Sequence, residues 1–303
     1  MVVYGLRAWH LLRTLPGLKR EDITAYTLLG PYLLWTAVLW LFPFFWVIWL
    51  ALQRWNFISP PAFVGLENFK TVLTDRLFWN TFKNQLYFLA VFVPVVTVTS
   101  LTLALLLNRL KFLQEIFATG YLLSYMSATV AMSLVFVLLF SADGLINTWL
   151  EKLIGTRIYF FGDPKIAMAS IAMVVVWKFT GYYALIFLAG LQAIPQDIYE
   201  AAEIDGAGRW TKLWRITIPL LNPALVTVVV FATMLSFNIF AEPFIITAGG
   251  PEHSTETFAL NIFTKLFESL DAGYASALAI LSTLITFMFI FIVRKLVERE
   301  VGL

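Results

Sequence analysis

Residues 28–52 read LLGPYLLWTAVLWLFPFFWVIWLAL, a run of twenty-five positions without a charged side chain. As an α-helix rising about 1.5 Å per residue, this stretch is roughly 37 Å long, which exceeds the roughly 30 Å hydrocarbon core of a bilayer. A helix of this length that is apolar on all sides needs lipid around it. The stretch therefore predicts a tilted transmembrane helix.

The rest of the chain has a composition of the same kind. Hydrophobic residues make up 60% of the 303 positions and charged residues 13%, against about 25% charged residues in soluble globular domains. Further stretches long enough to cross a membrane lie at about 85–107, 116–140, 166–191, 224–246 and 275–293. The expected fold class is an all-α membrane protein with six transmembrane helices over residues 28–293, and six spans place both termini on one side.

Lys and Arg residues on the connecting segments indicate the direction of the spans. Twelve of them fall on segment 1–27, on the second and fourth loops and on the tail 294–303, whereas the other three loops carry eight. Cytoplasmic flanks of membrane helices are enriched in these residues. Both termini are therefore expected in the cytoplasm. Charges interrupt every apolar run of segment 1–27, so we expect this segment to stay on the mature protein.

Residue types needed for several kinds of chemistry are missing from the sequence. There is no Cys, and His10 and His253 are too few and too far apart for a histidine metal site. No serine-hydrolase, zinc-protease or phosphate-binding loop motif occurs. The formal net charge is only +2, and no basic run could follow a phosphate backbone. We therefore predict no catalytic residue, no metal site and no nucleic-acid partner.

The loop between the fourth and fifth spans, residues 192–222, has the pattern of two short helices. Pro195 suits a first helical position, and Gly206 suits the left-handed residue that ends a helix. The second helix carries an apolar stripe with basic residues beside it, and the stripe comprises Trp210, Leu213 and Trp214. Such a stripe on a cytoplasmic loop predicts a partner.

The spacing within this loop resembles the loop motif of ABC-importer permeases. Glu200-Ala201-Ala202 is followed after three residues by Gly206, and nine residues later by Ile216-Thr217-Ile218-Pro219. The one departure is Ile218, where the usual pattern has Leu, an apolar exchange. The resemblance implies a coupling helix that inserts into a cleft of a cytoplasmic ATPase subunit. The residues it implies for coupling are Glu200, Ala201, Ala202, Asp205, Gly206, Ile216 and Pro219.

Further features resemble the carbohydrate branch of these importers, in particular the larger maltose-transport permease. They are Pro31 in the aromatic-rich first span, Gly-Leu-Glu-Asn-Phe at 65–69 and Thr-Ala-Gly-Gly-Pro at 247–251. The resemblance implies a bacterial or archaeal inner-membrane complex with a second permease, two copies of an ATPase that binds ATP and Mg, and an extracytoplasmic solute-binding protein. It implies no cofactor in this chain. The alternatives are a polyol or glycerol phosphate as substrate, a stand-alone secondary transporter, and an intramembrane enzyme.

A sugar site needs aromatic faces and polar groups that point into the bundle. The residues of spans three, four and five that we consider for the substrate path are Tyr125, Gly181, Tyr183, Ser236 and Asn238. Packing or an interfacial belt is the competing interpretation for the tyrosines, and contact between helices for Ser236. Asn238 and Glu242 are four residues apart, which predicts one shared face of a continuous fifth span.

Lys178 lies near the middle of the fourth span, where a charge costs roughly 2.5 to 3.5 kcal/mol even on a lenient insertion scale. It must therefore face a cavity or a partner. Glu242 reaches it only if the two helices are staggered, and a carboxylate of a second permease is the alternative. We predict a structural or gating role for Lys178 rather than substrate binding.

Overall fold

A computed structural model describes residues 20–110 and 114–298 of the chain. The elements in chain order are α2 (Arg20–Thr36), the π-helical turn η1 (Ala37–Leu41), α3 (Phe42–Ala51), β1 (Gln53–Arg54), β2 (Ala62–Phe63), α4 (Glu67–Thr74), α5 (Arg76–Leu107), α6 (Gln114–Met126), α7 (Thr129–Phe140), α8 (Leu145–Ile154), α9 (Ala167–Gln192), α10 (Gln196–Ile204), α11 (Arg209–Lys212), the π-helical turn η2 (Leu213–Thr217), α12 (Ile218–Leu220), α13 (Asn222–Asn238), α14 (Ala241–Thr247), α15 (Phe258–Phe263), the π-helical turn η3 (Thr264–Glu268) and α16 (Ala272–Val297). The two strands pair antiparallel, with Gln53 opposite Phe63. Several of the counted charges lie outside the described residues, namely Arg7, Arg13, Lys19, Lys111 and Arg299.

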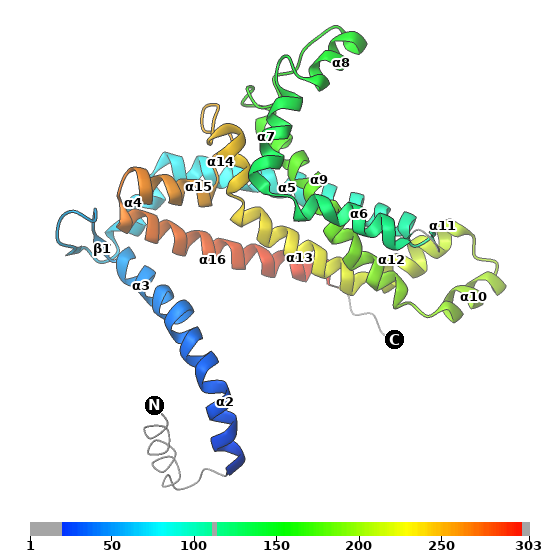
Figure 1. Cartoon of the computed structure of the whole chain (residues 1–303), viewed down its shortest axis with the longest axis horizontal. Helices are drawn as coiled ribbons and strands as arrows, with labels where there is room; N and C mark the ends of the chain where they lie inside the picture. The colour runs from blue at the N-terminus through cyan, green and yellow to red at the C-terminus, as the bar shows by residue number, and fades with distance from the viewer. Residues whose placement is uncertain (1–19, 111–113, 299–303) are drawn as a thin grey trace.

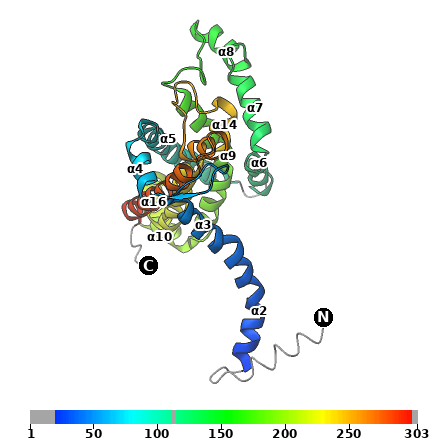
Figure 2. The same ribbon diagram turned by 90° about the vertical axis from the view of Figure 1, so that its left-hand side faces the viewer.

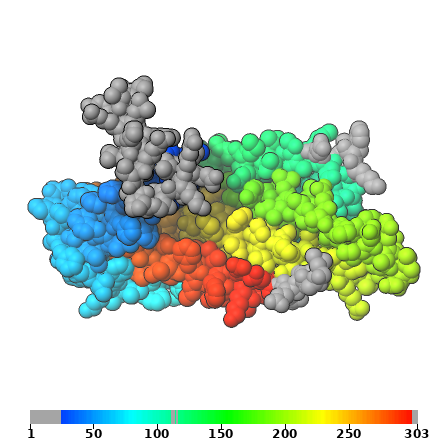
Figure 3. Space-filling model, turned by 90° about the horizontal axis from the view of Figure 1, so that it is seen from below, coloured from blue at the N-terminus to red at the C-terminus, as the bar shows by residue number. Residues whose placement is uncertain are grey.

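Four long helices, α5, α9, α13 and α16, run along the longest axis of the molecule (Figure 1). Helix α5 packs on α9 and α13, and α13 packs on α16. Buried apolar side chains of α5, α9 and α13 form the main core, and a second cluster joins α5, α15 and α16. Figure 3 shows α10 to α12 at one end of this bundle and α3 and α4 at the other. The bundle thus separates two sets of connecting segments.

Two helical arms leave the bundle in opposite directions. In Figure 2, α2 extends to one side, and α7 with α8 extends to the other. From residue 25 to residue 49 the side chains of this arm are almost all exposed, including those of Trp35, Trp40 and Phe45. The π-helical turn η1 ends just before Pro43, which has no N–H to continue the helical hydrogen bonding. These apolar arms require lipid or another membrane helix around them.

The expectation of an all-α membrane fold is confirmed. Among the described residues, five helices are long and apolar enough to cross a membrane, or six if α11 to α12 and α13, which meet at 65°, count as one bent span. Expected ranges 85–107, 166–191 and 275–293 lie within or close to α5, α9 and α16. Helix α5 begins earlier than expected because Asp75 caps it, its Oδ1 accepting a hydrogen bond of 2.8 Å from the Leu77 N–H.

Two expected ranges are each divided into two helices. Range 116–140 forms α6 and α7, which are separated at Ser127 and Ala128. No proline marks this break, but the hydroxyls of Ser124 and Ser127 donate back to carbonyls of α6, a pattern that bends helices. Range 224–246 forms α13 and α14.

The break between α13 and α14 has a clear cause in the sequence. A helix through Ile239 needs the N–H of residue 243 as a donor to the Ile239 carbonyl, and residue 243 is Pro. Ile239 is extended, with φ −64° and ψ 127°. The prediction that Asn238 and Glu242 share one helical face is therefore wrong. Asn238 is exposed at the end of α13, whereas Glu242 is buried in the first turn of α14.

Candidate functional site

Helix α10, which carries Glu200, Ala201 and Ala202 of the loop motif, is closed at its end by Gly206. Gly206 has φ +77°, a left-handed conformation that side chains with a Cβ rarely adopt. The Ala207 N–H donates to the Ala202 carbonyl at 2.8 Å, and the Gly206 N–H donates to the Glu203 carbonyl at 3.0 Å. These two bonds form the Schellman arrangement. The left-handed Gly206 predicted from the sequence is confirmed, whereas Pro195 precedes the first helical residue instead of occupying it.

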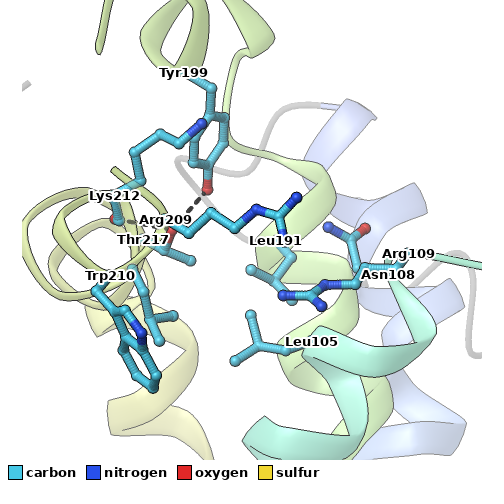
Figure 4. A pocket seen from close by; sticks show the side chains of 10 residues that line it. Leu105, Asn108, Arg109, Leu191, Tyr199, Arg209, Trp210, Lys212 and Thr217 are labelled. Atoms are coloured by element: carbon cyan, nitrogen blue, oxygen red, sulfur yellow. Dashed lines mark hydrogen bonds between the residues drawn. The ribbon is translucent and has the colours of Figure 1, made fainter. Parts of the chain in front are cut away.

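The returning segment α11–η2–α12 fixes α10 in place. Tyr199 of α10 and Thr217 of η2 share a hydrogen bond of 3.1 Å between their hydroxyl oxygens (Figure 4). Lys212 donates to the carboxylate of Glu203, and this hydrogen bond lowers the pKa of Glu203. Ala202 is buried. The two short helices therefore form one tied hairpin rather than a flexible connector.

One face of α10 remains uncovered. Glu200, Ala201 and Asp205 are exposed, and Ile204 is the most exposed large apolar side chain of the loop, at 87%. Of the other residues expected to take part in coupling, Ile216 is half-buried and Pro219 is exposed on the returning segment. Ile204 was not among our expected residues. It follows Glu200 by one helical turn, which is the signal in the sequence that could have identified it.

A buried ion pair joins α9 to α14 near the other break. Lys178 Nζ lies 2.9 Å from Glu242 Oε1 and 2.6 Å from Thr129 Oγ1, so the ammonium group has two partners. Both charged side chains are less than one tenth exposed. Thr129 is the first residue of α7 and Glu242 lies in the first turn of α14, so the pair connects α9 to the helices that follow both breaks. Thr129 was missed by the sequence analysis because the break before it was not expected.

Residues 96–302 match the family described as binding-protein-dependent transport system inner membrane component. This range includes α9, the loop with α10, and the ion pair. The chain belongs to this family of importer permeases. It is a multi-pass inner-membrane permease, and ATP is bound and hydrolysed by a separate subunit, so this chain is not itself an enzyme and carries no cofactor.

Named relatives of the permease are similar to it over most of their length. The sulfoquinovosyl glycerol transport permease SmoG of Agrobacterium fabrum is 33% identical over 90% of this chain and 91% of its own. The trehalose/maltose transport permease MalF of Thermococcus litoralis is 32% identical over 91% of this chain and 94% of its own. The lactose transport permease LacF of Rhizobium radiobacter is 32% identical, with 87% and 90% covered.

A solved structure has the same fold as the permease. A chain of a bacterial ABC transporter involved in alginate import superimposes with a TM-score of 0.80 at 21% identity, covering 98% of this chain and 100% of that one. A second structure of a bacterial alginate transporter, in complex with a periplasmic protein that binds an alginate pentasaccharide, gives 0.79 at 20% identity. At such identities the likeness concerns the fold.

Three of the residues considered for the substrate path belong to the contact between α6 and α9 of the permease. Tyr125 stacks on Tyr182 with ring centroids 4.6 Å apart, and Tyr182 in turn contacts Tyr183 at 5.3 Å. Tyr183 is fully buried, whereas Tyr125 is 38% exposed. A Cβ at Gly181 would collide with the backbone carbonyl of Tyr121. Gly181 thus allows α6 to approach α9. Of Tyr125, Gly181 and Tyr183, the residue with a large accessible side-chain surface is Tyr125.

Ser236 and Asn238 belong to α13 and differ in accessibility. Ser236 is fully buried, and its hydroxyl donates to the Ala232 carbonyl at 2.8 Å. Its own carbonyl accepts a hydrogen bond from the side-chain amide of Gln85, which ties α5 to α13. Asn238 is exposed, and its amide donates to the Met234 carbonyl at 2.8 Å, leaving the amide oxygen free of a protein donor among the described residues. Gln85 is a packing residue that the sequence analysis did not identify.

Proposed function

We propose that this permease carries a sugar or oligosaccharide across the inner membrane by alternating access, with α10 as its coupling helix. The observation that carries the proposal is one exposed face of α10, which comprises Glu200, Ala201, Ile204 and Asp205. The opposite side of the hairpin is held by the hydrogen bond between Tyr199 and Thr217 and by the ion pair between Glu203 and Lys212. An apolar tip next to two carboxylates suits a groove lined by apolar and basic side chains. The small side chain of Ala201 lets the helix enter such a groove closely.

The hairpin transmits movement because its two halves are joined. The bond between Tyr199 and Thr217 and the pair between Glu203 and Lys212 link α10 to the segment that continues into α13. A displacement of α10 by the ATPase therefore displaces α13 as well. Because α13 packs on α5 and α16, this displacement tilts the bundle. Ile216 and Pro219 lie on that segment, and Pro223, which has no N–H to donate to the Pro219 carbonyl, keeps the segment from joining α13 as one regular helix.

The partners in the proposal are a second permease, two copies of an ATPase and an extracytoplasmic solute-binding protein. Support for a second permease comes from residues 25–49 of α2, η1 and α3, whose side chains are almost all exposed in the single chain. Support for a binding protein comes from the family description and from the alginate transporter, whose complex contains one.

The proposal places both termini in the cytoplasm. The last described residues lie at the end of the bundle that also holds α10 to α12 (Figure 1). The excess of Lys and Arg on the two terminal segments and on the second and fourth loops supports a cytoplasmic location of these segments. Loops around α4, α8 and α15 then face the solute-binding protein.

For the substrate path we propose Tyr125 and Asn238, because each offers accessible surface. A half-exposed tyrosine ring presents an aromatic face to a sugar ring, and a free amide oxygen accepts a hydrogen bond from a hydroxyl. Gly181, Tyr183 and Ser236 support this path by packing. The pair between Lys178 and Glu242 has a structural or gating role. The SmoG, MalF and LacF relatives support a carbohydrate as the cargo.

The experiment that tests this function is uptake in vesicles. The permease is purified with the subunits that bind to it, reconstituted, and supplied with the solute-binding protein encoded with it and with labelled sugars, polyols and glycerol phosphate. We expect ATP-dependent uptake of a sugar, abolished when the ATPase is inactivated. Uptake by the permease alone would overturn the proposed mechanism. Uptake of glycerol phosphate but of no sugar would overturn the proposed substrate.

A further inference from the structure

A cavity of about 590 Å³ lies where α5 and α9 end, beside the hairpin of the cytoplasmic loop. Its residues are Leu105, Asn108, Arg109, Leu191, Tyr199, Arg209, Trp210, Lys212, Leu213 and Thr217. None of them takes part in the exposed face of α10. Tyr199, Lys212 and Thr217 hold the hairpin together, but the coupling role does not explain the other residues that line the cavity.

Two arginines of the cavity converge without an acidic partner. In Figure 4, Arg109 from the end of α5 and Arg209 from α11 extend into the cavity from opposite walls. Neither forms an ion pair with a carboxylate of the described residues, and no Asp or Glu is among those that line the cavity. Lys212, the third cation, is already paired with Glu203. Two like charges that face one another favour an anion between them.

The cavity combines these charges with apolar walls. Leu105 and Leu191 belong to the last turns of two spanning helices, so this part of the cavity lies at the edge of the hydrocarbon layer. Trp210 lines the cavity beside them and is 74% exposed, as is common for indole rings at the level of lipid headgroups. The arginines lie on the outer side of this wall, after the end of α5 and at the start of α11. The apolar walls of the cavity suit the glycerol backbone of a phospholipid, and the guanidinium groups on their outer side suit its phosphate.

We propose that this cavity binds the headgroup of an anionic phospholipid of the cytoplasmic leaflet, with Arg109 and Arg209 holding its phosphate. Guanidinium groups suit this task because their planar N–H donors match two phosphate oxygens at once. Asn108 supplies a further amide at the rim. A bound lipid joins α5 to α11, so the membrane composition acts on the same hairpin that carries the coupling helix.

The test uses the full chain, with the subunits that copurify with it, in nanodiscs of phosphatidylcholine with or without phosphatidylglycerol. Native mass spectrometry then counts the phosphatidylglycerol that stays bound. We expect retention by the unchanged protein, and roughly five-fold weaker retention for Arg109→Gln and for Arg209→Gln, the effect of losing one cation near a membrane surface. Arg209→Lys should retain more lipid than Arg209→Gln but less than the unchanged protein, because it keeps the charge and loses the planar pair of donors.

Arg215→Gln is the matched control. It removes the same charge from the same segment, but Arg215 is exposed and does not line the cavity. If Arg215→Gln loses as much lipid as Arg209→Gln does, the lipid is attracted by surface charge in general, and the proposed site is wrong. Two other results would also overturn it. One is binding of inorganic phosphate that depends on both arginines and is not displaced by phosphatidylglycerol. The other is unchanged lipid retention with release of the ATPase, which would make the cavity a protein contact.

Discussion

Lys178 Nζ and Glu242 Oε1 lie 2.9 Å apart, and this ion pair joins α9, the most buried of the candidate spans, to α14, the helix that follows the break caused by Pro243. Bulk solvent reaches little of either charge, because both side chains are less than one tenth exposed. Thr129 supplies a second oxygen to the ammonium group. Removing one partner of such a pair leaves an uncompensated charge, whereas removing both does not.

We therefore predict that Lys178→Met destabilises the permease by about 3 to 5 kcal/mol, and that Lys178→Met with Glu242→Met costs far less than the sum of the single changes. Thermal unfolding of the detergent-solubilised protein measures both. Arg54→Met is the control, because its pair with Glu67 is exposed outside the spans and should contribute at most about 1 kcal/mol. Additive effects at Lys178 and Glu242 would contradict the coupling between them.

The sequence predicted that Lys178 needs a partner but not which one. The cost of an intramembrane charge follows from composition alone. The identity of Glu242 depends on the break at Ile239, which turns Glu242 away from the face of Asn238. Pro243 signals that break, since the Ile239 carbonyl cannot receive a helical hydrogen bond from it. The break before Thr129 has no comparable signal, so this third member of the group could be found only from the structure.

The coupling loop was more predictable because its signals are local. Gly206 ends α10 for a reason of backbone sterics, and the motif gives the spacing of Glu200 and Gly206 directly. Which side chains of α10 are exposed does not follow from the nearby sequence, because it depends on how the returning segment α11–η2–α12 packs against α10. The bond between Tyr199 and Thr217 decides which face of α10 is covered, and therefore that Ile204 projects from the hairpin.

Glu200→Lys reverses a charge on the exposed face of α10. We predict that uptake falls about ten-fold or more while insertion and the amount of permease in the membrane stay normal, because the changed side chain lies in the proposed contact and not in the core. ATP hydrolysis and uptake are measured on the same vesicles. Asp197→Lys is the control, an exposed carboxylate in the first turn of the same helix but outside the motif. Equal losses in both variants would argue against a specific role of Glu200.

Gly206→Val places a branched side chain at φ +77°. We predict a loss of about 1 to 2 kcal/mol in local stability, seen as faster proteolysis of the hairpin and as weaker copurification of the ATPase. Gly208→Val is a close control. Gly208 has an ordinary φ of −68°, and nothing lies within 4 Å of the position of its Cβ. If the two variants behave alike, the left-handed turn is not what holds the hairpin in shape.

Glu256, in the loop between α14 and α15, has its pKa raised because burial disfavours the charged carboxylate, although His253 opposes this shift. A carboxyl group whose pKa is higher in the folded than in the unfolded state stabilises the fold when protonated, and this contribution is lost as pH rises through its folded pKa. We predict that Glu256→Gln is more stable than the unchanged permease at neutral pH, and that the difference shrinks as the pH is lowered toward the ordinary glutamate pKa of about 4.3. Melting temperatures across this range provide the measurement. A difference that does not depend on pH would contradict this assignment.

The most direct measurement of the central proposal is a cross-link from the tip of α10. The chain has no Cys, so Ile204→Cys introduces a single thiol at the most exposed apolar position of the hairpin. With a short thiol-reactive cross-linker in intact membranes, we predict one major product that joins the permease to its ATPase subunit, lost when Glu200→Lys is added. Labelling of this thiol by an impermeant reagent from outside the cell, or its free reaction with solvent in the assembled complex, would contradict the account.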